Sequence, residues 1–338
     1  MPHVMICGPD YIETCDSIAH AFESHGWTSS LFEWHIDPPG FLSRTINKMS
    51  RTYNRHTNLS NVFNKVLRES LIPATKVERP ELILIVKPHM IDQANLNVMP
   101  SLDIPVITWS TDSFSRFPGQ QSLVDISKIT YVQDGRDRVA KTVHWLPLGF
   151  DERIYCPTEQ SKNVDILFVG NIYRRDYGKR LYYFNLLRKS SICRKYSAAF
   201  IGSSPSTIRN YLSYLSGNVK WISKCLPLRD YARMIARSRI CINIHQDDGL
   251  QPINPLFFAI SACKSCQVAE ARNYLYEWMC PGRDFIAVDE TSFLATLQDL
   301  LESENTIQRI TTDGYKSAMN HSYFCRVKQI IDDFECLF

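Results

Sequence analysis

The sequence lacks any apolar run near the length of about 18 residues that a membrane-spanning helix needs. Its first apolar run, Val4–Cys7, follows no basic segment and ends at Gly8, so it does not have the form of a signal peptide. A net charge of +3 over 338 residues points by itself to neither nucleic acid nor an anionic membrane as the partner. We therefore expect a soluble, cytoplasmic protein without a membrane span.

A cysteine framework is also missing. The eleven cysteines are odd in number and scattered from Cys7 to Cys336, so we expect reduced thiols rather than a set of disulfides. Cys263 and Cys266 form the one close pair, and no second pair completes a zinc site. Ordinary packing is the favoured interpretation of this pair over metal or redox use, and we predict no bound metal.

What the chain does contain is the composition of a globular protein. Hydrophobic residues make up 44% and charged residues 22%, which excludes a disordered chain, a collagen-like fibre and a coiled coil. At roughly 100–200 residues per domain, the length of 338 residues predicts two domains. We place them at 1–155 and 156–320, followed by a helix at 321–338 that we expect to pack back toward the first domain.

Short apolar runs alternate with helical patterns in both halves of the chain, which predicts two parallel α/β sheets. The predicted strands are 4–7, 27–34, 82–86, 104–109, 129–133, 165–170, 198–202, 219–222, 239–245, 266–269 and 285–288. The predicted helices are 12–22, 42–71, 179–189, 207–215, 228–236, 254–263 and those at the C-terminus. Residues 145–163 are predicted to link the halves, and ligands are expected at the carboxyl ends of the strands, in a cleft between the two domains.

The most informative motif begins where the strand 165–170 ends. Gly170 and Asn171 are followed by Arg174 and Arg175, and a helix starts near Lys179. A glycine lets a ligand approach the backbone, and arginines bind phosphate in a bidentate way. This pattern predicts phosphate binding, with a solvated basic helix start as the alternative. The G-x-G-x-x-G spacing of a dinucleotide site is absent.

A second motif runs from Cys241 to Asn254. Its apolar strand ends on His245, which we expect to face the cleft, where it could donate to a phosphate or a sugar hydroxyl or titrate near neutral pH. Asn254 is predicted to cap the following helix. The alternative is a capping histidine without a ligand.

The first half contributes weaker candidates. Asp112 and Ser113 follow the strand 104–109, and Asp112 could orient or deprotonate an acceptor hydroxyl, although a turn-forming aspartate is an equal alternative. Gly8 and Asp10 follow the first strand and are weaker still. The basic stretch Arg44–Arg68 could contact nucleic acid, but it contains few aromatic residues and a solvated helix face is favoured.

Taken together, these motifs resemble those of the CgeB-like (spore maturation protein) group 1 glycosyltransferases, which are of the GT-B type. The resemblance covers about 145–335 and extends more loosely to Ser110–Asp112. The matching stretches are Asp165–Asn171 with Arg174 and Arg175, Ser238–His245, Asn254–Cys263, Pro281–Ile286, Gly314, and His321–Tyr323 with Arg326.

The chain departs from the family pattern in one helix. The family's usual run is Asn-x-Arg-x-Phe-Glu followed by Ala-Cys-Gly. Here Leu256 stands at the arginine position, Ala259 at the glutamate and Lys264 at the glycine. In similar GT-B enzymes the glutamate commonly hydrogen-bonds the donor ribose, and its loss removes an interaction of about 1.5–3 kcal/mol. These changes fit either an altered donor or a chain that has lost catalysis.

The resemblance implies a GT-B fold of two Rossmann-like domains and a glycosyltransferase that uses a nucleotide sugar, UDP-linked or other, as co-substrate. It implies no permanent cofactor, since GT-B enzymes generally need no bound metal. Donor contacts are expected from Gly170, Asn171, Arg174, Arg175, His245, Asn254 and the Ala259 position. Acceptor-side contacts are expected from Gly8, Asp10 and Ser113, with Asp112 and His245 as catalytic candidates.

Two other functions stay open at this point. One is a catalytically degenerate nucleotide-binding or sugar-binding protein that partners an active transferase, supported by Leu256 and Ala259. The other is a transferase acting on DNA bases, which Arg44–Arg68 could serve; nucleic acid is the less favoured partner.

Overall fold

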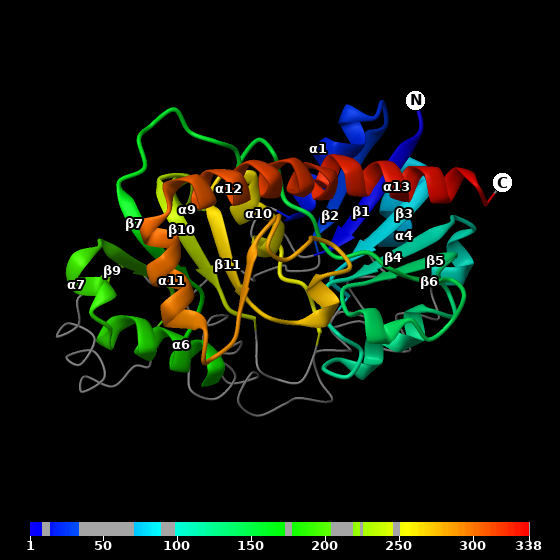
Figure 1. Ribbon diagram of the computed structural model, residues 1–338. Helices are drawn as coiled ribbons and strands as arrows, with labels where there is room; N and C mark the ends of the chain where they lie inside the picture. The colour runs from blue at the N-terminus through cyan, green and yellow to red at the C-terminus, as the bar shows by residue number, and fades with distance from the viewer. Residues whose placement is uncertain are drawn as a thin grey trace, which may run out of the picture. The chain divides into compact units, whose positions relative to one another are not determined.

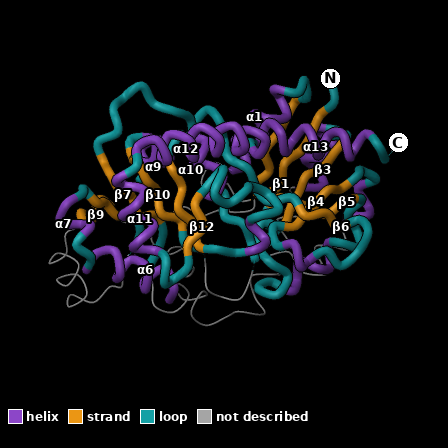
Figure 2. Tube along the Cα trace, viewed as in Figure 1, coloured by secondary structure: helices purple, strands orange, loops and turns teal. Residues whose placement is uncertain are grey.

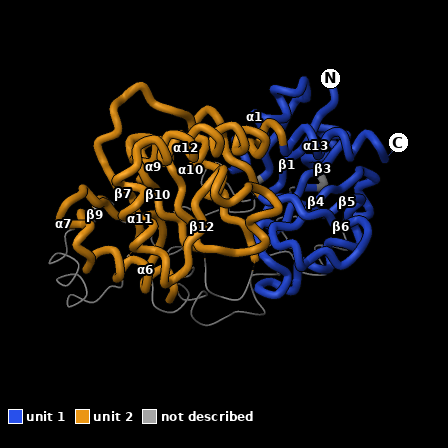
Figure 3. The backbone as a smooth tube through the Cα atoms, viewed as in Figure 1, with its two compact units in different colours: residues 1–147, 326–338 blue, residues 148–325 orange. Residues whose placement is uncertain are grey.

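The computed structural model describes residues 1–8, 14–33, 71–88, 99–172, 178–203, 219–223, 226–245 and 251–337. These residues form two compact units, which Figure 3 colours separately. Unit 1 comprises residues 1–147 and 326–338, and unit 2 comprises residues 148–325. Each unit contains one six-stranded sheet in which every strand pair is parallel, which confirms the predicted fold class.

The sheet of unit 1 has the strand order β2-β1-β3-β4-β5-β6 (Figure 1). Its strands are β1 (His3–Gly8), β2 (Thr28–Glu33), β3 (Leu82–Val86), β4 (Val106–Ser110), β5 (Ile129–Val132) and β6 (Val143–Trp145). All five residues of β3 are buried, as expected of a central strand covered on both faces. The strand order reverses between β1 and β3, so this is the position where a fold of this kind binds ligands.

The core of unit 1 is completed by the end of the chain. Helix α13 (Tyr323–Glu335) crosses into this unit at Arg326 and lies along the sheet (Figure 1). The Tyr131 hydroxyl donates to the Asp333 carboxylate over 2.6 Å, and the rings of Trp27 and Phe334 meet edge to face at 5.7 Å. The remaining described α-helices of unit 1 are α1 (Thr14–Ser24) and α4 (Ile72–Glu78).

The sheet of unit 2 has the order β12-β11-β10-β7-β8-β9, with its reversal between β7 and β10. Its strands are β7 (Val164–Val169), β8 (Ala198–Ile201), β9 (Val219–Ser223), β10 (Ser238–Asn243), β11 (Cys266–Glu270) and β12 (Ile286–Val288). Its described helices are α6 (Gly178–Lys189), α7 (Ile192–Lys195), α9 (Leu228–Ala236), α10 (Leu256–Ala262), α11 (Phe293–Glu302) and α12 (Glu304–Ala318), shown in purple in Figure 2.

Alternate residues of β7 pack into two apolar layers, one on each face of the sheet of unit 2. One face of β7 packs Ile166 and Phe168 against α6, α7 and α11, while Leu167 and Val169 pack against α9 and α10 on the other face. This is the period-two arrangement of a buried parallel strand. No helix in the described part of the chain is long and apolar enough to cross a membrane.

Most predicted elements agree with the structure, and two short ones in unit 1 were not predicted. β6 ends at Trp145, where the predicted linker begins, and it was missed because three residues of mixed exposure give no apolar run. α4 begins at Ile72, just after the range predicted as a long helix. The predicted helices at 42–71, apart from Leu71, and at 207–215 lie outside the described residues.

Candidate functional site

The reversal of strand order in unit 2 brings a buried arginine to the carboxyl ends of β7 and β10. Arg180, in the first turn of α6, donates from Nε to the Ile244 carbonyl over 2.7 Å and from Nη1 to the Asn171 carbonyl over 3.1 Å. One guanidinium therefore ties together the two chain segments that leave these strands. It also fixes a positive charge at the position where α/β sheets bind their ligands.

The Arg180 side chain lies against the backbone of Gly170. The residue has a φ of +120°, and a Cβ atom built on it would lie 3.0 Å from Nη1 of Arg180. The sequence predicted that Gly170 makes room for a ligand, whereas in the structure the adjoining space is taken by the Arg180 side chain. Asn171 has a supporting role as well, since its Oδ1 accepts from the Ser203 amide over 3.0 Å at the end of β8.

His245 lies at the end of β10 and is only 2% exposed. Its ring packs edge to face on Phe257 at 5.9 Å and on Tyr274 at 6.2 Å. Among the described residues, neither ring nitrogen has a hydrogen-bond partner. Buried polar atoms are normally satisfied, so the two nitrogens keep unused hydrogen-bonding capacity.

The protonation state of His245 follows from its surroundings. Burial, and then the nearby charges of Arg272 and Arg180, lower its pKa well below the usual 6.5. The ring is therefore neutral at pH 7 and offers one N–H donor and one acceptor nitrogen. This suits contact with a sugar hydroxyl, or donation to a phosphate oxygen.

A carboxylate beside His245 links two further cations. Glu270, the last residue of β11, accepts from Lys179 Nζ at 2.8 Å and from Arg272 Nη2 at 2.7 Å. With Arg180, the described residues at the carboxyl ends of β7, β10 and β11 supply three cationic groups and one carboxylate. The excess of positive charge suits a diphosphate. We call Lys179, Arg180, His245, Glu270 and Arg272 the unit 2 edge cluster.

Sequence reasoning identified His245 but not the other four members of the unit 2 edge cluster. Lys179 and Arg180 stand in the predicted phosphate motif, where Arg174 and Arg175 were preferred; the latter two lie outside the described residues. Glu270 and Arg272 carried no local signal apart from their place at the end of a predicted strand.

Asn254 acts as a structural connection. Its amide exchanges hydrogen bonds with that of Asn243 over 3.3 and 3.2 Å, and its Oδ1 accepts from the Phe257 amide over 3.1 Å. The residue therefore fastens the start of α10 to the end of β10, as the capping interpretation expects.

Two of the three departures from the family pattern lie in α10, and the third, Lys264, follows its end. Ala259 is fully buried and presents no exposed surface, and Leu256 packs into the apolar layer beneath α9. Lys264 has a φ of +53° and holds its Nζ 4.9 Å from the Tyr315 ring centroid. Lys264 precedes the first residue of β11, and Glu270 is the last residue of that strand. The five residues of the strand span about 16 Å. Lys264 therefore lies far from the positive charge around His245.

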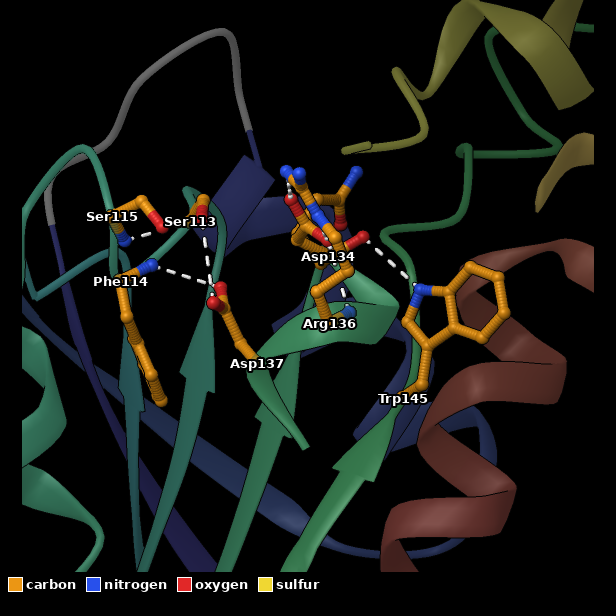
Figure 4. A network of polar contacts seen from close by, with 8 residues as sticks. Ser113, Phe114, Ser115, Asp134, Arg136, Asp137 and Trp145 are labelled. Carbon is orange, nitrogen blue, oxygen red and sulfur yellow. Dashed lines mark hydrogen bonds and ion pairs between the residues drawn. The ribbon is translucent and has the colours of Figure 1, made fainter. Parts of the chain in front are cut away.

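Unit 1 presents Asp112 and Ser113 after β4. Asp112 forms an ion pair with Arg116 at 3.7 Å. The loop is anchored from below by Asp137, which accepts from the Phe114 amide over 2.8 Å and from the Ser113 hydroxyl over 3.4 Å (Figure 4). Ser113 is buried and so serves the loop itself.

The other acceptor-side candidates follow β1. A Cβ atom on Gly8 would lie 2.7 Å from the Val86 carbonyl oxygen, so this glycine permits the close approach of β1 to β3. Asp10 lies outside the described residues.

The close cysteine pair has the environment of core residues. Cys263 and Cys266 are buried, and burial raises the pKa of both thiols, that of Cys266 to about 12. Such thiols are poor nucleophiles at neutral pH. The described residues contain no group of three or more His, Cys, Asp or Glu side chains that could hold a metal ion.

The pKa of His245 makes stability depend on pH. Below pH 6.5 the unfolded chain takes up a proton that the folded ring resists, so the free energy of unfolding falls with decreasing pH. We expect His245→Leu to remove this contribution, which amounts to about 1.4 kcal/mol for each pH unit below that value. Urea unfolding of both proteins at pH 7.5 and 5.5 measures it. Parallel losses in the two proteins would contradict the buried neutral ring.

Comparison of the structure with solved structures finds full-length similarity at low identity. Sucrose-phosphate synthase from Thermosynechococcus elongatus matches with a TM-score of 0.69 and 12% identity, over 100% of this chain and 99% of that one. HepE from Anabaena, solved with UDP and glucose, matches with a TM-score of 0.66 and 12% identity, over 99% and 100%. A glycosyltransferase from Rickettsia africae matches with a TM-score of 0.65 and 10% identity, over 99% and 98%. At this identity the likeness shows a shared fold, the GT-B fold.

The sequence comparisons identify a family for the second half of the chain. No curated protein matches the chain significantly. One family model, described as glycosyl transferase-like, matches residues 159–332, just over half of the chain. The matched stretch includes the whole unit 2 edge cluster. The chain thus belongs to the glycosyl transferase-like family.

Proposed function

We propose that this protein transfers a sugar from a nucleotide-sugar donor to an acceptor hydroxyl. Unit 2 binds the donor and unit 1 the acceptor. The observation that carries the proposal is the buried His245 imidazole, which has no hydrogen-bond partner among the described residues and lies near Arg180 and Arg272. Arg272 shares Glu270 with Lys179. A nucleotide sugar matches both parts of this environment, because its diphosphate is anionic and its sugar carries hydroxyls.

Support for the donor class comes from the structural neighbours. HepE has been solved with UDP, with UDP-glucose, and with UDP and glucose together. We infer a nucleoside diphosphate sugar, with UDP as the first nucleotide to test. Membership of the CgeB-like group belongs to the same proposal.

The reaction needs stabilisation of the departing nucleoside diphosphate. In the proposed complex, Lys179 and Arg272 balance the growing charge on its phosphate oxygens. Fixed charges in a site shielded from water are effective here because they need little reorganisation during the reaction. Arg174 and Arg175 are proposed to add to this positive charge.

The hydroxyl chemistry is assigned to two residues. His245, being neutral, accepts or donates one hydrogen bond to a donor hydroxyl or phosphate and so fixes the position of the sugar. Asp112 is proposed to orient the acceptor hydroxyl, and its carboxylate is 22% exposed beside Arg116. Because the ion pair with Arg116 holds the Asp112 carboxylate in place, this carboxylate is suited to accept a hydrogen bond from the acceptor hydroxyl and so to orient it.

A second candidate is a binding protein that has lost catalysis. It is favoured by the fully buried Ala259 and by Leu256, which leave α10 without the charged pair of the family pattern. This candidate predicts nucleotide-sugar binding without turnover. A role on DNA bases rests on Arg44–Arg68, which lies outside the described residues.

The donor site is tested by exchanging Lys179 for methionine. We expect Lys179→Met to weaken UDP binding by about tenfold or more, because a charge-assisted hydrogen bond contributes about 1.5–3 kcal/mol. Lys189→Met is the matched control, since this exposed lysine lies at the other end of α6. Isothermal titration of the full chain with UDP measures all three proteins. Equal affinity of the two variants would place the phosphates elsewhere.

A further inference from the structure

The positive charge of the chain is concentrated in one stretch of unit 2. From Tyr177 to Arg229 the sequence contains ten lysine and arginine residues and no aspartate or glutamate. Since the whole chain has 38 basic and 35 acidic residues, the net charge is +10 in these 53 residues and −7 in the rest. The overall charge of +3 therefore conceals a strongly basic segment in a chain that is otherwise acidic.

The topology of unit 2 brings several of these cations to one edge of its sheet. The chain leaves β7 at its carboxyl end, passes through α6 and α7, and enters the parallel strand β8. Both helices therefore end at the amino edge of the sheet, with Lys189 in the last turn of α6 and Arg194 and Lys195 in that of α7. In the neighbouring strand β9, Lys220 pairs with Ala199, the second residue of β8. It thus lies at the same edge.

We call Lys189, Arg194, Lys195 and Lys220 the unit 2 basic surface. All four residues are exposed. Of the four, Lys195 alone forms an ion pair with a described residue, namely with Glu302 at 3.5 Å, and the two side chains are 62% and 52% exposed. Ion pairs between exposed side chains are weak, so this pair leaves Lys195 available to another anion.

Two carboxylates from other elements at the amino edge are already paired. Asp165 of β7 and Glu304, the first residue of α12, both contact Arg239, at 2.8 and 2.7 Å. They therefore balance the charge of Arg239, which is not part of the unit 2 basic surface.

Helix ends explain only part of this distribution. Cations in the last turn stabilise a helix through its macrodipole, which accounts for Lys189, Arg194 and Lys195. Lys220 lies on a strand and has no such role. The macrodipole also gives no reason for the lack of acidic residues over the whole stretch from Tyr177 to Arg229.

The position of the unit 2 basic surface favours a broad anionic surface as its partner. β9 is the last strand of the sheet, and residues of α7 and β9 share one apolar layer at this end of unit 2 (left in Figure 1). The neighbouring aromatic ring, that of Tyr196, is half-buried, with Lys195 Nζ 5.0 Å from its centroid. Binding of single-stranded nucleic acid uses aromatic rings on which bases stack, and reading of a duplex places a helix or a strand pair in a groove. Here the cations stand at helix ends and on an edge strand, so charge alone attracts the partner.

We propose that the unit 2 basic surface binds the headgroups of an anionic lipid membrane. Each lysine or arginine close to such a membrane strengthens binding by roughly fivefold. The proposed donor site lies at the carboxyl ends of the strands, the opposite edge of the same sheet, so contact with lipid leaves it accessible to a nucleotide sugar. The inference adds a partner to the protein and does not depend on the proposed glycosyl transfer.

The test measures co-sedimentation of the full chain with lipid vesicles. Vesicles of equal parts phosphatidylcholine and phosphatidylglycerol carry the negative charge, and vesicles of phosphatidylcholine alone are the neutral control. We expect the anionic vesicles to bind the chain at least about tenfold more tightly. We also expect this preference to disappear at about 1 M salt, where the Debye length is about 3 Å.

A variant with Arg194→Gln, Lys195→Gln and Lys220→Gln is expected to bind the anionic vesicles about tenfold or more weakly than wild type. The matched control variant loses the same charge from unit 1, by exchange to glutamine of three exposed lysines, namely Lys76, Lys128 and Lys141. We expect both variants to keep the melting temperature of the wild type, because every substituted residue is exposed.

Three results would overturn the proposal. The first is equal binding to neutral and anionic vesicles, and the second is an equal loss of binding in the two triple variants. The third is binding to duplex DNA at a salt concentration that abolishes vesicle binding, with the same dependence on the three cations, which would assign the surface to nucleic acid. UDP titration tests the donor site separately, because the basic-surface variant should bind UDP as the wild type does. Absence of UDP binding together with the expected vesicle binding would contradict the donor proposal alone.

Discussion

Deletion of residues 326–338 is expected to unfold unit 1. Four apolar side chains of α13 are buried in this unit, namely Val327, Ile330, Ile331 and Phe334. Full burial of such side chains contributes about 1.5–3 kcal/mol each, which gives roughly 6–12 kcal/mol for the group. That equals the whole stability of many domains. The hydrogen bond from Tyr131 to Asp333 is lost as well.

Limited proteolysis with mass spectrometry measures this effect, because an unfolded unit 1 is cleaved across residues 1–147 while unit 2 is protected. The control is a chain that ends at Glu335, since Cys336 and Leu337 are exposed. A deletion variant with wild-type protection of residues 1–147 would show that α13 is dispensable.

Arg180→Met is expected to destabilise unit 2 by about 3 kcal/mol or more. The variant leaves the carbonyls of Ile244 and Asn171 without their charged donor, and hydrogen bonds to charged groups contribute about 1.5–3 kcal/mol each. Methionine keeps much of the apolar volume, so the loss reports the guanidinium. It also removes a charge that lowers the pKa of His245, which should therefore rise toward its ordinary value.

Two measurements follow Arg180→Met. Urea unfolding gives the stability, and NMR titration of the His245 ring gives the direction of its pKa. Lys189→Met, on the same helix, controls for a changed charge on α6. Stability equal to that of wild type, together with an unmoved His245 pKa, would show that the guanidinium does not connect the ends of β7 and β10.

The sequence predicted those strands and site residues that a short run of neighbouring residues identifies. β3 and β7 were predictable because continuous apolar runs mark strands buried on both faces. β6 was not, since three residues of mixed exposure make no such pattern. His245 was predictable because it ends an apolar strand.

The rest of the unit 2 edge cluster depends on contacts between distant segments. Lys179 and Glu270 are 91 positions apart and meet because the sheet places β11 beside β10 and β10 beside β7. No local pattern encodes that order. The structure also supplies a reason for the family glycine at position 264, because Lys264 adopts a φ of +53° there. Glycine takes such a conformation without strain.

Incubation of the wild-type chain with UDP-glucose, with UDP titration alongside, tests the central claim most directly. The account predicts that UDP binds, that Lys179→Met weakens this binding, and that UDP is released from UDP-glucose when an acceptor is present. Mass spectrometry detects the glucosylated product. Binding without release across a panel of sugar acceptors would favour a non-catalytic protein. Absence of binding to UDP-glucose and to sugars linked to other nucleoside diphosphates would contradict the account.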